Sequence, residues 1–108
     1  MLQIDMDSKY GILFIRLFGE LTSATYQKLE NEVATLLVKI GVKNAVFNLD
    51  NIKYIDNMGY QALHKCLKIC QKNKGNGMVC ANQNKFEYYL KPYKVVTDEL
   101  SAVSLINS

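Results

Sequence analysis

The strongest constraint on the fold is a strand pattern over residues 42–49, in the middle of the chain. It is continuously apolar at Ala45-Val46-Phe47, as is typical of a strand buried on both faces of a sheet. A short polar and apolar link follows. From Asn57 onward, apolar residues then recur at helical spacing, at Met58, Ala62, Leu63, Cys66, Ile69 and Cys70. The sequence therefore predicts a central strand that leads through a polar turn into the N-terminus of an amphipathic helix.

The residues before this strand predict a hairpin and a first helix. Alternation over 2–6 and the β-branched run 12–18 indicate two antiparallel strands, joined by a turn at 7–11 and ended by Gly19-Glu20. Thr22 or Ser23 is expected to cap a helix that ends at Gly41. Its predicted core stripe is Leu29, Val33, Leu36, Leu37 and Ile40.

The residues after the central helix predict two more strands and two more helices. Short strands are expected at 78–81 and 95–96. Asn84 is expected to cap a third helix, and Asp98-Glu99 to start a final one. The inward residues of the third helix would be Phe86, Tyr89, Leu90 and Tyr93, and those of the last Leu100, Val103, Leu105 and Ile106. The predicted order, ββαβαβαβα, is that of an α/β fold with an open mixed β-sheet, an N-terminal hairpin and about four helices.

Composition narrows the class of protein. A chain of 108 residues with 49% hydrophobic and 21% charged residues fits one globular domain, residues 1–108. No apolar run reaches the roughly 18–20 residues that a membrane helix needs, and the early acids argue against a signal peptide. Three cysteines and a single histidine would supply a metal site poorly. We therefore expect buried, reduced cysteines in a cytoplasmic protein without a cofactor.

Charge is unevenly distributed along the chain. Between Asn57 and Phe86 there are five lysines (65, 68, 72, 74 and 85) and no acid, although the net charge is only +3. Such a segment favours an acidic partner, and an ordinary solvated helix face is the alternative. Nothing in it indicates a nucleic-acid or membrane partner.

Catalytic motifs are absent from the sequence. There is no nucleophile elbow, no dinucleotide fingerprint and no P-loop. His64 lies on a helical face, where a surface or interface role is expected rather than that of a base. Asp50 and Asp56 are two carboxylates expected near one sheet edge, and paired carboxylates can act in acid–base catalysis. Asp50 fits a turn former better and Asp56 a helix cap, so we expect a binding module rather than an enzyme.

The segment Asn48-Leu-Asp-Asn-Ile-Lys-Tyr-Ile-Asp-Asn-Met-Gly-Tyr60 resembles a signature of the STAS domain, in the SpoIIAA-like family of anti-sigma-factor antagonists. That family carries the pattern D-L-S-x-V-x-F-I-D-S-S-G-L at this place. The similarity extends to Glu20-Leu21-Thr22, to 75–80 and to 97–103. It implies a small switch protein that binds an anti-sigma factor, a serine kinase of the histidine-kinase-like ATPase type. Phosphorylation of a serine in D-S-S-G would end that binding.

This chain departs from the family pattern at the phosphorylated position. The two serine positions hold Asn57 and Met58, which cannot accept phosphate. One interpretation is a constitutive antagonist without the phosphorylation brake, and another is a turn that now serves a different interaction. A third is purely structural, with Asn57 as a helix cap and Met58 as a core residue.

A partner surface is predicted around the same turn. Tyr60, His64 and Lys68 stand at i, i+4 and i+8, in one row that we expect to be exposed and to suit an acidic partner. The residues expected to contact a partner are Thr22, Ser23, Asp50, Asp56, Asn57, Met58, Gly59, Tyr60, His64 and Lys68. The alternative function is a scaffold or sensor subunit of a larger signalling assembly, in which self-association is possible.

Overall fold

The computed structural model describes residues 1–82 and 93–107, which form a five-stranded mixed sheet with helices on both faces. The strands lie in the order β1-β2-β3-β4-β5, with β1 antiparallel to β2 and the other neighbours parallel. Their bounds are Leu2–Lys9, Ile12–Leu21, Ala45–Ile55, Gly77–Cys80 and Val95–Val96. The helical elements are α1 (Tyr26–Leu29), η1 (Glu30–Ala34), α2 (Thr35–Ile40), α3 (Asn57–Lys72) and α5 (Glu99–Ile106). The predicted α/β class, N-terminal hairpin and mixed sheet are confirmed, while the helix expected from Asn84 lies outside the described residues.

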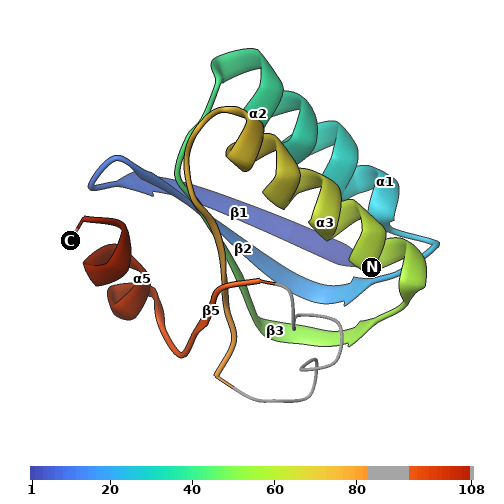
Figure 1. The fold of residues 1–108 in the computed structure, drawn as a ribbon. Coiled ribbons are helices and arrows are strands. Elements are labelled where there is room, and N and C mark those ends of the chain that lie inside the picture. The colour runs from blue at the N-terminus through green and yellow to red at the C-terminus, as the bar shows by residue number, and fades with distance from the viewer. Residues whose placement is uncertain (83–92, 108) are drawn as a thin grey trace.

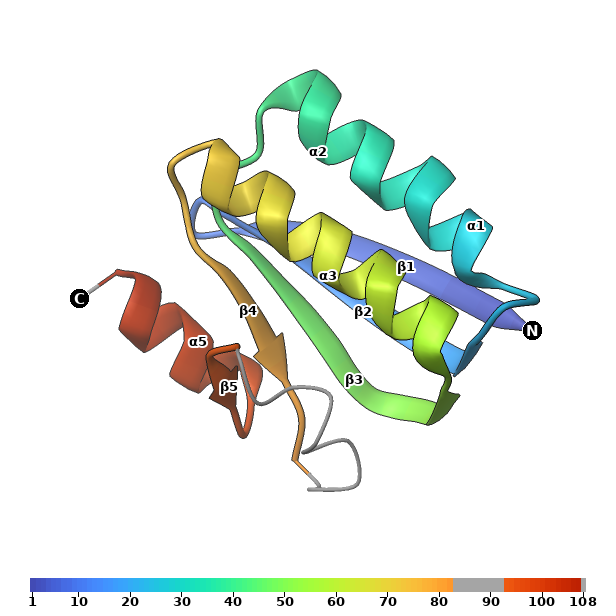
Figure 2. The ribbon, with the colours of Figure 1, turned by 45° about the vertical axis from the view of Figure 1, so that its right-hand side comes forward.

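The sheet is covered unequally on its two faces. The continuous rod of α1, η1 and α2 lies beside α3 on one face, and α5 lies on the other, beside β4 and β5 (Figures 1 and 2). Alternate residues of β3 enter the two cores, with Ala45 and Phe47 facing the helix pair and Val46 facing the α5 side. All three are fully buried, as the apolar run predicts.

Both central strands are longer than the sequence indicates. Gly19-Glu20 does not end β2, because Gly19 stays in the strand with a φ of 105° and packs so closely on Met1 that a Cβ would meet the Met1 carbonyl. The prediction that the central strand ends at Leu49 and is followed by a link is also wrong, because β3 continues to Ile55. Two shifts in the β2–β3 register each place an extra β3 residue opposite β2, and such bulges bend a strand.

The first helix starts later than predicted and contains an irregular turn. Neither Thr22 nor Ser23 caps it, because the N-cap is Thr25, whose side chain makes no capping hydrogen bond. The rod then passes through the wider π-helical turn of η1. Ile40, expected in the core, is 65% exposed in the last turn of the helix. Gly41 ends the helix in the left-handed conformation, as predicted.

The central helix α3 follows its predicted pattern closely. Its buried side chains include Ala62, Leu63, Cys66, Leu67 and Cys70. All three cysteines of the chain are buried and free, as expected. Burial raises the pKa of Cys66 and of Cys80 to about 12, so both stay thiols at neutral pH. Among the described residues, no helix is long and apolar enough to cross a membrane.

A charged cluster fixes α5 to the sheet. Arg16 donates two hydrogen bonds to the Glu99 carboxylate, at 2.9 and 2.7 Å, and Asn48 Nδ2 donates a third at 2.9 Å. These hydrogen bonds lower the pKa of Glu99, and those from Arg16 contribute most. Ala102 packs into the core beneath, whereas Leu100 and Leu105, predicted as inward residues, are 79% and 43% exposed. The helix is therefore held by its charged N-terminus as much as by an apolar stripe.

Glu99→Gln is expected to lower the free energy of unfolding at pH 7 by about 1–2 kcal/mol, because a charge-assisted bidentate contact is lost. The pKa of Glu99 is lower in the folded chain than in the unfolded chain, where it is about 4.3. The ionised side chain therefore stabilises the fold above about pH 4.3, and this contribution is lost as the pH falls through the folded-state pKa. The difference between variant and wild type should therefore shrink below about pH 4. Urea unfolding at pH 7 and pH 3 measures it, with the exposed Glu32→Gln as control. An equal difference at both pH values would contradict this role.

Candidate partner-binding site

The site is built where β2 and β3 end together. The two strands are parallel neighbours, and the last pair in register is Leu21 and Ile55. The turn after β2 and the turn after β3 therefore emerge side by side at the carboxyl edge of the sheet, where α/β proteins usually carry their sites. The Asp56 N–H donates to the Leu21 carbonyl at 3.2 Å, which ties the second turn to the first strand.

The Asp56 carboxylate joins the two turns. One oxygen accepts a hydrogen bond from the Gly59 N–H at 2.9 Å and caps α3, as predicted. The other accepts from the Ser23 N–H at 2.8 Å, across to the turn before α1. These backbone donors, the Gly59 N–H first and the Ser23 N–H second, lower the pKa of Asp56. Its oxygens are thus occupied as structural acceptors, which argues against a role as a general base.

The turn before α1 is preorganised to present Ser23. Thr25 Oγ1 accepts from the Thr22 N–H at 2.9 Å and donates to the Glu20 carbonyl at 2.8 Å. Thr22 Oγ1 accepts from the Ala24 N–H at 3.2 Å. With both threonines engaged in the turn, Ser23 is left exposed at its tip, with its N–H directed at Asp56.

The first turn of α3 exposes the two substituted positions. Asn57 is exposed and is not the cap, because Asp56 holds that place. Met58 is 36% exposed, so the expectation of a core residue is wrong. Gly59 is buried against β2, and a Cβ there would meet the Leu21 carbonyl. The close fit at Gly59 directs the preceding two side chains outward.

Asp50 contacts a different part of the chain from the Asp56 junction. It is an exposed residue of β3 whose Oδ1 accepts a hydrogen bond from the Asn82 N–H at 2.6 Å, just beyond the end of β4. No contact joins it to the Asp56 carboxylate among the described residues. The pairing of Asp50 with Asp56 for acid–base chemistry thus gains no support from the geometry, and the role of a local acceptor fits better.

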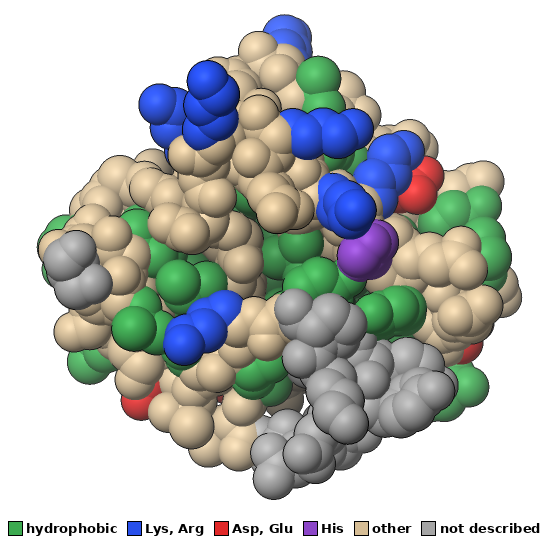
Figure 3. Space-filling view, in the orientation of Figure 1, with side chains coloured by type: hydrophobic (Ala, Val, Ile, Leu, Met, Phe, Trp, Pro, Cys, Tyr) green, Lys and Arg blue, Asp and Glu red, His purple; other side chains and the backbone are tan. Residues whose placement is uncertain are grey.

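The row along α3 is only partly exposed. Tyr60 and His64 are half-buried, contrary to the expectation of a fully exposed row, and their rings stack at a centroid distance of 6.2 Å. Tyr93 packs on the same pair, with its ring centroid 5.5 Å from that of His64. Lys68 is exposed. In Figure 3 the histidine is bordered by basic and hydrophobic side chains, so this surface joins an aromatic part to a basic part.

Sequence reasoning found most of these residues but missed the contact that joins them. The hydrogen bond from Ser23 to Asp56 spans 33 positions, and no local pattern indicates it. The role of Thr25 was missed too, although a Thr-Ser-Ala-Thr run is typical of a turn closed by hydroxyl groups. The packing of Tyr93 on His64 depends on the return of the chain to the sheet at β5.

Comparison with known proteins agrees with the fold and the motif. An anti-sigma F factor antagonist of Paenibacillus polymyxa is 27% identical over 79 residues, which cover 73% of this chain and 68% of that protein. An anti-sigma factor antagonist from Mycobacterium paratuberculosis superposes with a TM-score of 0.86 at 15% identity, over 100% of this chain and 96% of that one.

Two structures of SpoIIAA, one described as an anti-sigma factor antagonist and the other as a Bacillus cell fate determinant, are also similar. The unphosphorylated form gives a TM-score of 0.77 at 16% identity, over 100% of this chain and 99% of that one. The phosphorylated form gives 0.76 at 14% identity, over 95% and 99%. The sequence model of the STAS domain matches residues 3–105. Because that match spans nearly the whole chain, the protein belongs to the STAS domain family.

Proposed function

We propose that this chain is a non-enzymatic anti-sigma-factor antagonist of the cytoplasm. It binds a kinase-type anti-sigma factor and thereby controls transcription. The observation that carries the proposal is the junction at Asp56, where one carboxylate holds the turns after β2 and β3 together and leaves Asn57 and Met58 on the surface. A relative of the same family is named an anti-sigma F factor antagonist, which supports the class of partner.

The partner surface that we propose extends from Ser23 and the first turn of α3 along the helix to Lys68. Met58 supplies an exposed apolar contact at one end, and the Lys68 ammonium supplies a charge at the other. An exposed hydrophobic group beside a basic strip fits a partner face with an apolar centre and acidic residues around it.

The proposed binding lacks the phosphorylation brake. SpoIIAA has been observed in phosphorylated and unphosphorylated forms. In this chain neither Asn57 nor Met58 carries a hydroxyl group, so a kinase bound at this turn finds no acceptor there. We infer that the complex persists in the presence of ATP.

Gel filtration of the chain with a kinase-type anti-sigma factor tests the proposal, alone and with ATP or ADP. A complex should elute under both nucleotide conditions. Lys68→Glu should weaken it about tenfold, because a favourable charge contact becomes repulsive. The exposed Lys39→Glu, with the same charge change on α2 and outside the proposed surface, is the matched control and should bind as wild type. If no complex forms with either nucleotide, the proposed function is wrong.

A further inference from the structure

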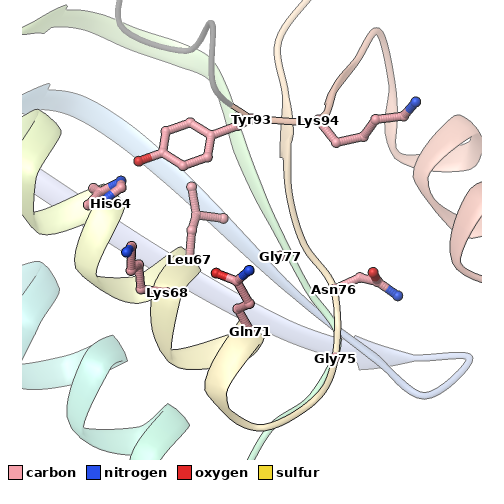
Figure 4. A pocket seen from close by; sticks show the side chains of 9 residues that line it. All are labelled: His64, Leu67, Lys68, Gln71, Gly75, Asn76, Gly77, Tyr93 and Lys94. Carbon is pink, nitrogen blue, oxygen red and sulfur yellow. The ribbon is translucent and has the colours of Figure 1, made fainter.

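A pocket of about 350 Å³ opens on the side of α3 that faces β4, apart from the Asp56 junction (Figure 4). Three segments line it: α3, the link to β4, and the residues just before β5. The lining residues are His64, Leu67, Lys68, Gln71, Gly75, Asn76, Gly77, Tyr93 and Lys94. Its volume is at the lower end of small-molecule sites, about 300–1,000 Å³, and equals about ten water volumes.

Two polar atoms at one wall of this pocket have no hydrogen-bond partner. They are His64 Nδ1 and Tyr93 Oη, and they are the only buried side-chain polar atoms without a partner among the described residues. Their rings lie side by side, and the Tyr93 hydroxyl points toward His64 (Figure 4). A buried polar atom without a partner costs free energy in an otherwise satisfied structure, so two at one wall call for an explanation.

Among the lining residues that the structure describes, all the charged ones are basic. They are Lys68 and Lys94, and neither lysine forms an ion pair within residues 1–82 and 93–107. In Figure 4, Lys68 and Gln71 stand on the same side as His64, whereas Lys94 and Asn76 point the other way. The converging groups are therefore one ammonium, one amide, one imidazole and one phenol, with Leu67 as an apolar wall.

We propose that this pocket binds a small molecule that carries a carboxylate or phosphate group. The anion pairs with the Lys68 ammonium and accepts from the Gln71 amide, and its remaining oxygens reach the Tyr93 hydroxyl. Charge-assisted hydrogen bonds of this kind are roughly twice as strong as neutral ones, and no acidic side chain is among the described lining residues. Because Tyr93 Oη is covered in the unliganded chain, binding includes a rotation of the Tyr93 ring.

The single histidine of the chain makes the test specific, because its ring signals in an NMR spectrum come from His64 alone. The full chain is titrated with inorganic phosphate and separately with acetate, at fixed pH and ionic strength, against a chloride reference. We expect a saturable change of the His64 signals with at least one anion. Saturation by phosphate alone assigns a phosphate ligand, and saturation by acetate alone assigns a carboxylate.

Three variants separate a built pocket from general attraction to a basic surface. Lys68→Gln should weaken binding about tenfold, and Tyr93→Phe severalfold, while the thermal midpoint of unliganded Tyr93→Phe stays equal or rises because an unpaired hydroxyl is gone. Lys39→Gln removes the same charge elsewhere and should bind as wild type. The proposal is overturned if neither anion saturates, or if Lys39→Gln weakens binding as much as Lys68→Gln does. No partner protein enters this test, so its failure leaves the proposed function intact.

Discussion

Restoring both hydroxyl groups, in Asn57→Ser/Met58→Ser, is expected to turn a persistent complex into one that ATP dissolves. Both positions are on the surface at the first turn of α3, where a bound kinase would find a serine. Phosphorylation adds a charge of about −1.5 to −2 at neutral pH. The complex of the restored variant should therefore weaken roughly 100-fold in ATP and stay intact in ADP.

The fold should tolerate the phosphate. The N-terminus of a helix has unpaired N–H groups and the positive end of the helix dipole, both of which stabilise an anion. The Asp56 carboxylate already uses the Gly59 N–H, so the phosphate must share this end of α3 with a second negative group. We expect the thermal midpoint to change little, since the new charge is exposed to solvent.

Mass spectrometry of residues 54–62 after incubation with the kinase and ATP measures the acceptor directly. The wild-type chain should carry no phosphate there, and Asn57→Ala/Met58→Ala provides a matched control without hydroxyl groups. Phosphate on Tyr54 or Tyr60 of the wild type would contradict the interpretation that the chain is a constitutive antagonist. A restored variant that is phosphorylated yet stays bound would show that this turn is not the contact on which the complex depends.

Gly59→Ala is expected to lower the free energy of unfolding by about 2–3 kcal/mol. Helix propensity alone predicts the opposite sign, because alanine is favoured over glycine in a helix by about 1 kcal/mol. Here the added Cβ would meet the Leu21 carbonyl, a backbone atom that cannot move without displacing the end of β2. Since Leu21 also accepts from the Asp56 N–H, the strain would be passed to the junction itself.

Thermal unfolding followed by circular dichroism checks this result, with a midpoint lower by more than about 8 °C for a chain of this size. Gln61→Ala, two positions further along the same helix at an exposed site, should leave the midpoint nearly unchanged. A Gly59→Ala variant as stable as wild type would mean that α3 does not need its close approach to β2.

The order and type of the described elements could be predicted because local patterns decide them. The buried run at Ala45-Val46-Phe47, the helical spacing from Met58 to Cys70 and the acid caps at Asp56 and Asp98 all act over a few residues. Strand ends could not be predicted in the same way. Glycine has a low strand propensity, so Gly19 is predicted to end the strand. The strand β2 nevertheless continues, because pairing with β1 and β3 satisfies the backbone of Gly19 on both sides.

The turn from Asp56 to Gly59 likewise has features that the sequence predicts and contacts that only the structure shows. The sequence by itself determined that this turn caps a helix, that it follows a central strand, and that it has no hydroxyl group to phosphorylate. Only the tertiary structure decided that the Ser23 N–H donates to the second oxygen of Asp56 and that the Tyr93 ring packs on His64. The reason is that caps and periodic stripes are contacts between near neighbours in the chain, whereas these contacts join segments that are far apart in the chain and that the sheet brings together.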